Sequence, residues 1–233
     1  MKSLKTICIA LCAALVLVGC NMNNTAKGTA IGAGGGAALG AIVGALAGNT
    51  VIGAAVGTAV GAGAGAIIGH KMDKAKKEAE AIQTAQGEEV KDANGLDAVK
   101  VTFASGILFA TGKDQLSSEA KSSLQQLAGV LKGNSDCDVA IQGYTDNQGW
   151  KNSTAEQSAQ KNQALSLDRA TAVSSYLLAL SVPATQIKSV EGFGEANPVA
   201  SNATKDGQAQ NRRVEVYMYA SQKMIQEAEQ AAQ

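Results

Sequence analysis

Apolar residues follow three different patterns along the chain. A short continuous apolar run covers 7–18, behind Lys2 and Lys5. From 28 to 69 polar side chains are nearly absent and glycine recurs at every fourth position. From about residue 96 onward, stretches with the period of a strand alternate with stretches with the period of a helix. The pattern therefore predicts a targeting segment, a glycine-rich helical region and a C-terminal folded domain.

The N-terminal run has the features of a bacterial secretory signal. Basic residues precede it, and it is shorter than the about 20 residues that a bilayer span needs. It ends in LVGC at 17–20, which resembles a lipobox, the motif in which the cysteine is lipidated and becomes the new N-terminus. We expect a signal peptide over 1–19, a lipid anchor on Cys20 and a lipidated segment over 20–27. The following Asn21, in place of an Asp, favours delivery to the outer membrane.

The glycine spacing predicts a helical hairpin over 28–70, with its turn near Asn49. A spacing of four places one residue per turn on one helix face, where glycine allows a second backbone to approach closely. Each arm has about 18 residues, or roughly 27 Å of helix, close to the about 30 Å of a hydrocarbon core. We expect the hairpin to associate with a membrane, either inserted in it or lying on its surface, and to be capable of forming a homo-oligomer. The glycines in register are Gly32, Gly36, Gly40, Gly44, Gly48, Gly53, Gly57, Gly61, Gly65 and Gly69.

Charged and polar residues dominate the segments on both sides of the predicted domain. Residues 71–95 are rich in Lys, Glu, Ala and Gln and end in a turn-rich stretch, which predicts a charged helical linker. The Gln-, Glu- and Ala-rich tail over 221–233 predicts a frayed helix. We therefore place the domain at 96–220.

Within this domain, β-branched residues alternate in short runs and leucines recur at steps of three and four. We expect strands over 98–103, 138–144, 187–193 and 213–219, and helices over about 117–131 and 166–180. The order βαβαββ implies an α/β fold, an α+β sandwich with the helices on one face of a mixed sheet.

Charge and composition argue against several functions. Lys plus Arg and Asp plus Glu are both 20, so no net charge attracts nucleic acid. The single histidine, His70, lies far from the domain's motifs, and Cys137 has no histidine partner there. Zinc-ligand spacing, a phosphate loop and a nucleophile elbow are not found in the sequence. We expect no catalysis, no cofactor and no metal, and we interpret Cys137 as a small buried hydrophobic residue.

A set of polar motifs follows the predicted strands in a fixed order. They are TDNQG at 145–149, NQALSLDRA at 162–170, GFGEANP at 192–198 and NRRVE at 211–215. Their order and composition resemble the OmpA-like domain family. Together with the lipobox and the glycine zipper, the chain resembles the YiaD-type lipoproteins of the outer membrane. The resemblance implies an outer-membrane lipoprotein whose OmpA-like domain lies in the periplasm and binds peptidoglycan.

The resemblance also implies the binding residues. The family grips the peptide stem of peptidoglycan at diaminopimelate, whose end carries an ammonium and a carboxylate. Asp146 is expected to pair with the ammonium, and Arg169 to bind the carboxylate through two parallel hydrogen bonds. Asn162 either contacts a stem carbonyl or holds its own loop. Arg212 or Arg213 either adds a second positive group or forms a structural ion pair.

The sequence departs from the family pattern in two places. Extra residues over 153–160 either lengthen a loop or extend the next helix backward, and Trp150 at their start either covers the ligand or packs the loop. Ala110 stands where many relatives have an Asp. The expected function is a lipid-anchored tether between outer membrane and cell wall, with peptidoglycan and outer-membrane lipid as partners. The alternative is a zipper-driven oligomeric assembly protein that uses wall binding only for positioning.

Overall fold

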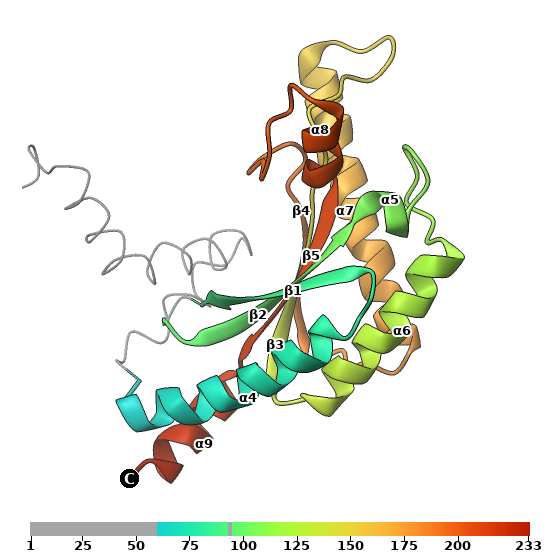
Figure 1. Cartoon of the computed structure of the whole chain (residues 1–233). Coiled ribbons are helices and arrows are strands. Elements are labelled where there is room, and N and C mark those ends of the chain that lie inside the picture. The colour runs from blue at the N-terminus through green and yellow to red at the C-terminus, as the bar shows by residue number, and fades with distance from the viewer. Residues whose placement is uncertain (1–59, 93–94) are drawn as a thin grey trace, which may run out of the picture.

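The computed structural model describes residues 60–92 and 95–233 (Figure 1). The predicted signal peptide, Cys20 and most of the glycine-zipper hairpin lie outside the described residues. The elements are α4 (Ala62–Glu80), β1 (Ala85–Lys91), β2 (Asp97–Ala104), α5 (Ser105–Leu108), α6 (Ser118–Gly133), β3 (Cys137–Gly143), α7 (Ala155–Ala179), β4 (Ile187–Gly192), α8 (Lys205–Asn211), β5 (Arg213–Ala220) and α9 (Gln222–Ala231).

The strands form one five-stranded sheet in the order β1-β2-β5-β3-β4. β3 and β4 are parallel, and the other neighbouring pairs are antiparallel, so the sheet is mixed. The predicted strands agree with β2, β3, β4 and β5 to within one residue at each end. The prediction of a βαβαββ fold is thereby confirmed, with β1 added at the sheet edge.

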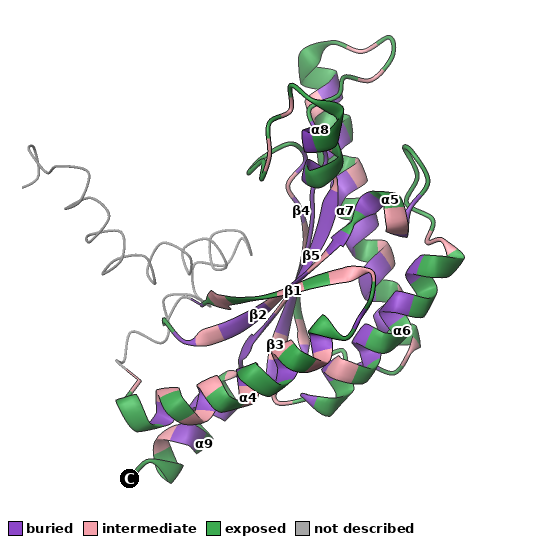
Figure 2. Cartoon of the chain, viewed as in Figure 1, coloured by how far each residue is buried: buried purple, intermediate pink, exposed green. Residues whose placement is uncertain are grey.

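The main core lies between the sheet and a layer formed by α4, α6 and α7 (Figure 1). Val99, Val101 and Phe103 point into it from β2 because alternate residues of a strand share one face. Figure 2 shows the buried residues along the strands and on the helix sides that meet the sheet. The side chain of Ser117 caps α6 by accepting a hydrogen bond from the Ala120 amide at 2.9 Å.

The segment predicted as a linker over 71–95 is part of the domain. Helix α4 runs through the expected boundary at residue 70 and packs against β1, β2 and α9. Its buried residues are Ala64, Ile68, Met72, Ala75 and Ala79. These residues lie on one face of the helix, which continues across the expected boundary. The many charges on the opposite face make this apolar face hard to recognise in the sequence. The end of the second zipper arm therefore packs in the domain core.

Strand β1 was not predicted, because most of its residues are polar and its burial is incomplete. It pairs with β2 from Ala85↔Phe103 to Lys91↔Asp97 and forms an edge of the sheet. Polar residues suit such an edge, since they discourage pairing with another chain.

The tail also differs from its prediction as a frayed helix. Met224, Ile225 and Ala228 of α9 are buried, and α9 packs against α4. Ser221 caps this helix by accepting from the Met224 amide at 3.1 Å. The domain is therefore closed at this end by the helices that precede and follow its sheet (Figure 1).

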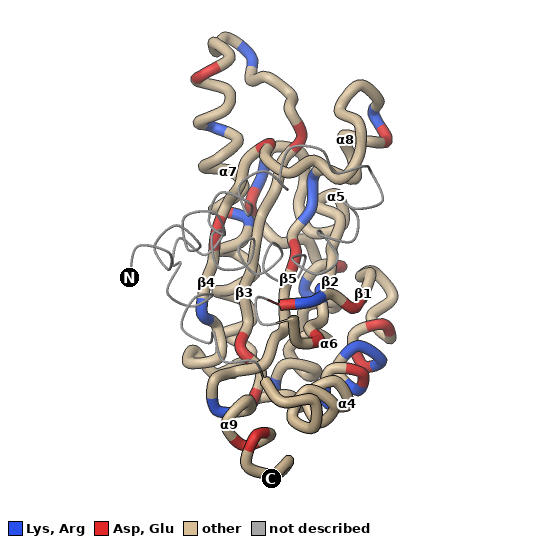
Figure 3. Tube along the Cα trace, turned by 90° about the vertical axis from the view of Figure 1, so that its left-hand side faces the viewer, with Lys and Arg blue, Asp and Glu red and all other residues tan. Residues whose placement is uncertain are grey.

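Basic and acidic residues are interspersed along the tube in Figure 3. Over 60–92 and 95–233, no helix combines the length and apolarity of a membrane span, and no acidic, His and Cys side chains gather as a metal site. Cys137 is buried, as expected, and burial raises the pKa of its thiol to about 12.

If α4 belongs to the core, a conservative truncation on its buried face should weaken the whole domain. Ile68 is fully buried, so Ile68→Val is expected to lower the free energy of unfolding by about 1 kcal/mol, measured by urea denaturation. Lys77→Ala, on the exposed side of the same helix, is the control and should change little. Equal stability of Ile68→Val and the wild type would contradict the assignment of α4 to the domain.

Candidate functional site

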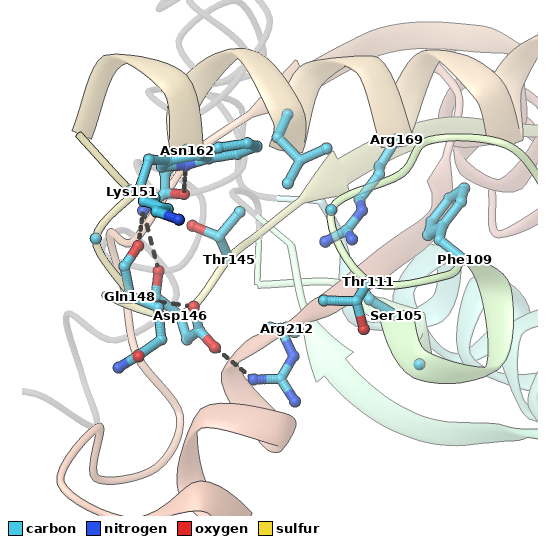
Figure 4. Close-up of a pocket in the computed structure, with 15 residues that line it drawn as sticks. Ser105, Phe109, Thr111, Thr145, Asp146, Gln148, Lys151, Asn162, Arg169 and Arg212 are labelled. Atoms are coloured by element: carbon cyan, nitrogen blue, oxygen red, sulfur yellow. Dashed lines mark hydrogen bonds and ion pairs between the residues drawn. The ribbon is translucent and has the colours of Figure 1, made fainter. Parts of the chain in front are cut away.

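A pocket of about 470 Å³ opens at the end of the sheet where β3 finishes (Figure 4). Its walls come from α5 and the loop after it, the loop after β3, the inner side of α7 and the residue before β5. The predicted binding residues Asp146, Asn162, Arg169 and Arg212 all line it. Segments far apart in the sequence therefore converge on one cavity.

Close packing of α7 on the sheet creates this convergence. Gly143 and Gly192 are partners on β3 and β4 and lie directly below the helix. A Cβ atom on Gly143 would lie 2.0 Å from the Ser166 carbonyl oxygen, and one on Gly192 would lie 2.3 Å from the Leu167 amide nitrogen. The Ser166 hydroxyl also accepts a hydrogen bond from the Gly194 amide at 2.8 Å. The two glycines thus allow the helix to carry its polar residues over the end of the sheet.

Residues 155–160, within the segment predicted to be extra, form the first turns of α7. Thr154 caps the helix, and Gln157 completes a capping box with the Thr154 amide at 3.0 Å. The helix therefore starts at Ala155, earlier than the predicted 166, because this capping signal was not recognised in the sequence. Arg169 therefore lies in the middle of α7, whereas the helix predicted over 166–180 would place it near the start.

Arg169 provides a buried cation at one side of the pocket. Its side chain is held by a hydrogen bond from Nε to the Lys113 carbonyl at 3.0 Å, and its guanidinium lies 5.2 Å from the centre of the Phe109 ring. Figure 4 shows the guanidinium directed into the pocket. Two effects lower the pKa of Arg169 from its ordinary value: burial, which is the larger, and the positive charge of the nearby Arg212. The arginine nevertheless remains charged. A fixed and poorly hydrated guanidinium favours binding of an anion.

Asp146 supplies the negative charge on the other side. One carboxylate oxygen accepts from the Gln148 amide at 3.2 Å, and the other pairs with Nη1 of Arg212. The Asp146 side chain is 9% exposed, against 38% for Arg212. The pocket therefore holds one shielded carboxylate and two guanidinium groups, of which that of Arg169 is deeply buried and that of Arg212 is accessible.

Arg213 has a structural role. It is buried, donates from Nε to Glu215 at 2.6 Å, and stacks over the Tyr144 ring at 3.7 Å. Its terminal nitrogens donate to the carbonyls of Asn211 and Asn197, each at 3.2 Å. Of the two arginines in the NRRVE motif, Arg212 is therefore the one that lines the pocket.

Asn162 organises the loop that carries Asp146. Its Oδ1 accepts from the indole nitrogen of Trp150 at 2.7 Å, while its Nδ2 donates to the Gln148 and Asp146 carbonyls at 3.2 and 3.4 Å. The amide of Trp150 donates to the Ser158 hydroxyl at 3.0 Å. Of the readings left open by the sequence, the hydrogen bonds favour loop organisation for Asn162. Trp150 packs this loop and lines the pocket as well.

Several lining residues were not identified from the sequence. Ser105 and Gly106 come from α5, a single helical turn that follows β2, and Thr145 was named only as part of a motif. No spacing in the sequence signals that α5 lies beside Arg212, because the antiparallel pairing of β2 with β5 brings them together. Ala110 is exposed and is not among the residues that line this pocket.

Comparisons with known proteins match the chain in two parts. The family model described as the OmpA family matches residues 108–212, and that of the YMGG-like Gly-zipper matches residues 1–73. Among solved structures, a MotB-like protein from Desulfovibrio vulgaris superposes with a TM-score of 0.57 at 20% identity, covering 67% of this chain and 96% of the other. The cell wall anchor of the T6SS from Pseudomonas aeruginosa gives 0.51 at 27%, covering 64% and 97%.

Curated relatives include several envelope proteins. The peptidoglycan-binding protein ArfA of Mycobacterium tuberculosis is 45% identical over 93 residues, 40% of this chain and 26% of ArfA. The probable lipoprotein YiaD of Escherichia coli is 34% identical over 149 residues, 64% of this chain and 63% of YiaD. In both cases the match spans less than two thirds of the relative. The outer-membrane lipoprotein YfiB of Pseudomonas aeruginosa is 31% identical over 136 residues, 58% of this chain and 73% of YfiB. By its fold, its motifs and these matches, the chain belongs to the OmpA family.

Proposed function

We propose that this protein is a non-catalytic outer-membrane lipoprotein that binds the peptide stem of peptidoglycan at diaminopimelate and so tethers the outer membrane to the cell wall. The observation that carries the proposal is the placement of Asp146 and Arg169 on opposite sides of one pocket. This arrangement complements a ligand that carries an ammonium and a carboxylate on the same carbon.

The charges of the site suit such a zwitterionic end. The ammonium of the ligand forms an ion pair with Asp146, which is paired with Arg212 in the free protein. The carboxylate of the ligand receives hydrogen bonds from Arg169, a residue whose planar fork matches carboxylate geometry. Arg212 is accessible enough to move toward a second acidic group of the stem, since its side chain is 38% exposed.

The relatives support the remaining parts of the proposal. ArfA is named for peptidoglycan binding, and the T6SS structure is described as a cell wall anchor. YiaD and YfiB are named lipoproteins, which supports lipidation of Cys20. Each buried CH₂ of an acyl chain contributes about 0.8 kcal/mol to membrane binding. We infer that the anchor holds the protein on the outer membrane, with the domain in the periplasm.

The match of residues 1–73 to a glycine-zipper model favours a second candidate, an oligomeric assembly protein. In that case wall binding serves only to position an oligomer formed through the zipper. In that case the double variant Gly40→Leu, Gly57→Leu should no longer form detergent-resistant oligomers. If the protein is only a tether, the same double variant should still bind the wall.

Co-sedimentation of the full chain, kept in mild detergent, with isolated peptidoglycan tests the first candidate. We expect the wild type in the pellet and Asp146→Asn in the supernatant, because the amide no longer attracts the ammonium of the ligand. Free diaminopimelate should release the wild type by competition. Asp168→Asn, an exposed carboxylate on α7, is the control and should sediment as the wild type does. A wild type that stays in solution would overturn the proposed function.

A further inference from the structure

Two buried hydroxyl groups of the pocket lack a hydrogen-bond partner among the described residues. They are Ser105 Oγ and Thr145 Oγ1, in side chains of residues that are 2% and 4% exposed. Leaving a buried hydroxyl unpaired destabilises the folded state, and folded proteins keep few such groups. Unpaired hydroxyls that line a binding pocket indicate that a ligand completes their hydrogen bonds.

Both residues are held firmly by their backbones. The Ser105 amide donates to the Arg212 carbonyl at 2.9 Å, and the Ser105 carbonyl accepts from the Phe109 amide at 2.7 Å. The Thr145 amide donates to the Gly194 carbonyl at 2.7 Å. These hydrogen bonds fix the backbones of both residues at the wall of the pocket. Such a preorganised group loses little conformational freedom when a ligand binds.

The two residues come from opposite sides of the pocket (Figure 4). Thr145 directly precedes Asp146, and Figure 4 shows it between Asp146 and Asn162. Ser105 lies on the other side of the pocket, where its amide is bonded to the Arg212 carbonyl. The guanidinium of Arg169 extends into the space between these two sides. A ligand that spans from Asp146 to Arg169 would therefore have one of these two residues on each side.

We propose that Ser105 and Thr145 are additional ligand-binding residues that recognise the two ends of a free amino-acid group. Thr145 Oγ1 accepts a hydrogen bond from the ligand ammonium, next to Asp146. Ser105 Oγ donates one to the ligand carboxylate, next to Arg169. An ammonium has three donors and a carboxylate has about four acceptor positions, so one charged partner at each end leaves groups for the hydroxyls to satisfy. The inference rests on the proposed function of the same pocket.

The proposal predicts that removing either hydroxyl weakens ligand binding without lowering the stability of the fold. Thr145→Val keeps the shape of the side chain and removes a hydroxyl that makes no hydrogen bond to the described residues. The melting temperature should therefore stay the same or rise, because an unpaired buried polar group is replaced by an apolar one. A hydroxyl with a purely structural role would produce a lower melting temperature instead.

Calorimetric titration of the full chain in detergent with a soluble muropeptide whose stem ends in diaminopimelate measures the affinity. We expect Thr145→Val and Ser105→Ala each to raise the Kd about tenfold or more, which corresponds to the loss of one hydrogen bond to a charged group. Thr145→Ser retains the hydroxyl and should bind nearly as the wild type does. Thr171→Val, exposed on α7 outside the pocket, is the control.

The outcomes separate this inference from the proposed function. If the wild type binds and both variants bind equally well, the hydroxyls do not contact the ligand and the inference is wrong, while the tether stands. A weaker affinity that comes with a lower melting temperature also overturns it, since the hydroxyls then act on the fold. If the wild type does not bind the muropeptide, both the inference and the proposed function fail.

Discussion

Arg169→Ala is expected to release the protein from peptidoglycan almost completely. Arg169 is 3% exposed and its guanidinium is directed into the pocket, whereas the side chain of Arg212, the other arginine that lines the pocket, is 38% exposed. Removing one buried charge contact costs about 2–5 kcal/mol, or a Kd raised roughly thirtyfold to several thousandfold. The same muropeptide titration measures this change, and co-sedimentation shows it with the intact wall polymer.

Arg169→Lys separates charge from geometry in this prediction. Lysine keeps the positive charge but loses the planar fork and the contact with the Phe109 ring, so we expect an affinity between those of the wild type and Arg169→Ala. The Nε hydrogen bond to Lys113 is lost in both variants, and thermal unfolding therefore has to accompany the titrations. Binding of Arg169→Ala at wild-type strength would place the carboxylate of the ligand elsewhere.

Gly143→Ala is expected to disrupt both the fold and the site. The added Cβ would lie 2.0 Å from a backbone oxygen of Ser166, an atom that cannot move without the helix. Displacing α7 opens the core and separates Arg169 from Asp146. We expect a loss of about 3 kcal/mol or more in the free energy of unfolding, together with loss of peptidoglycan binding. Urea denaturation and co-sedimentation measure the two effects.

Gly129→Ala is the matched control for this substitution. Gly129 is exposed on α6, and a Cβ there meets no described atom within 4 Å. Alanine has a higher helix propensity, so this variant should gain up to about 1 kcal/mol in stability and bind as the wild type does. The same chemical change is thus expected to act with opposite sign at the two glycines. Equal stability of the two variants would show that α7 does not seat on Gly143 as described.

The strands and the binding motifs could be predicted from the sequence because their signals are local. Val99 and Val101 alternate with polar neighbours as a strand requires, and the expected strands match the observed ones closely. Asp146 and Arg169 were found through the order of motifs that resembles a family. Each of these features depends on residues that are neighbours in the chain, so it does not require knowledge of which distant segments meet.

Burial and pairing were decided by the tertiary structure. The charged stretch that begins at Lys71 was expected to be a solvated linker. The apolar face of its helix, however, completes the core against β1 and β2. The N-terminal turns of α7 depend on the cap at Thr154. Without that cap, the same residues could equally form a loop. In both cases the local sequence permits more than one conformation, and contact with the sheet or with a capping side chain selects between them.

The sequence by itself determined the order of the strands and helices, the family motifs and the candidate binding residues Asp146, Asn162, Arg169 and Arg212. Only the tertiary structure decided what each of these residues contacts. It pairs Arg212 with Asp146, assigns Asn162 to the loop through Trp150, and brings Ser105 into the pocket. The physical reason is that these contacts join segments distant in the chain, and they depend on the close crossing of α7 over the glycines of β3 and β4.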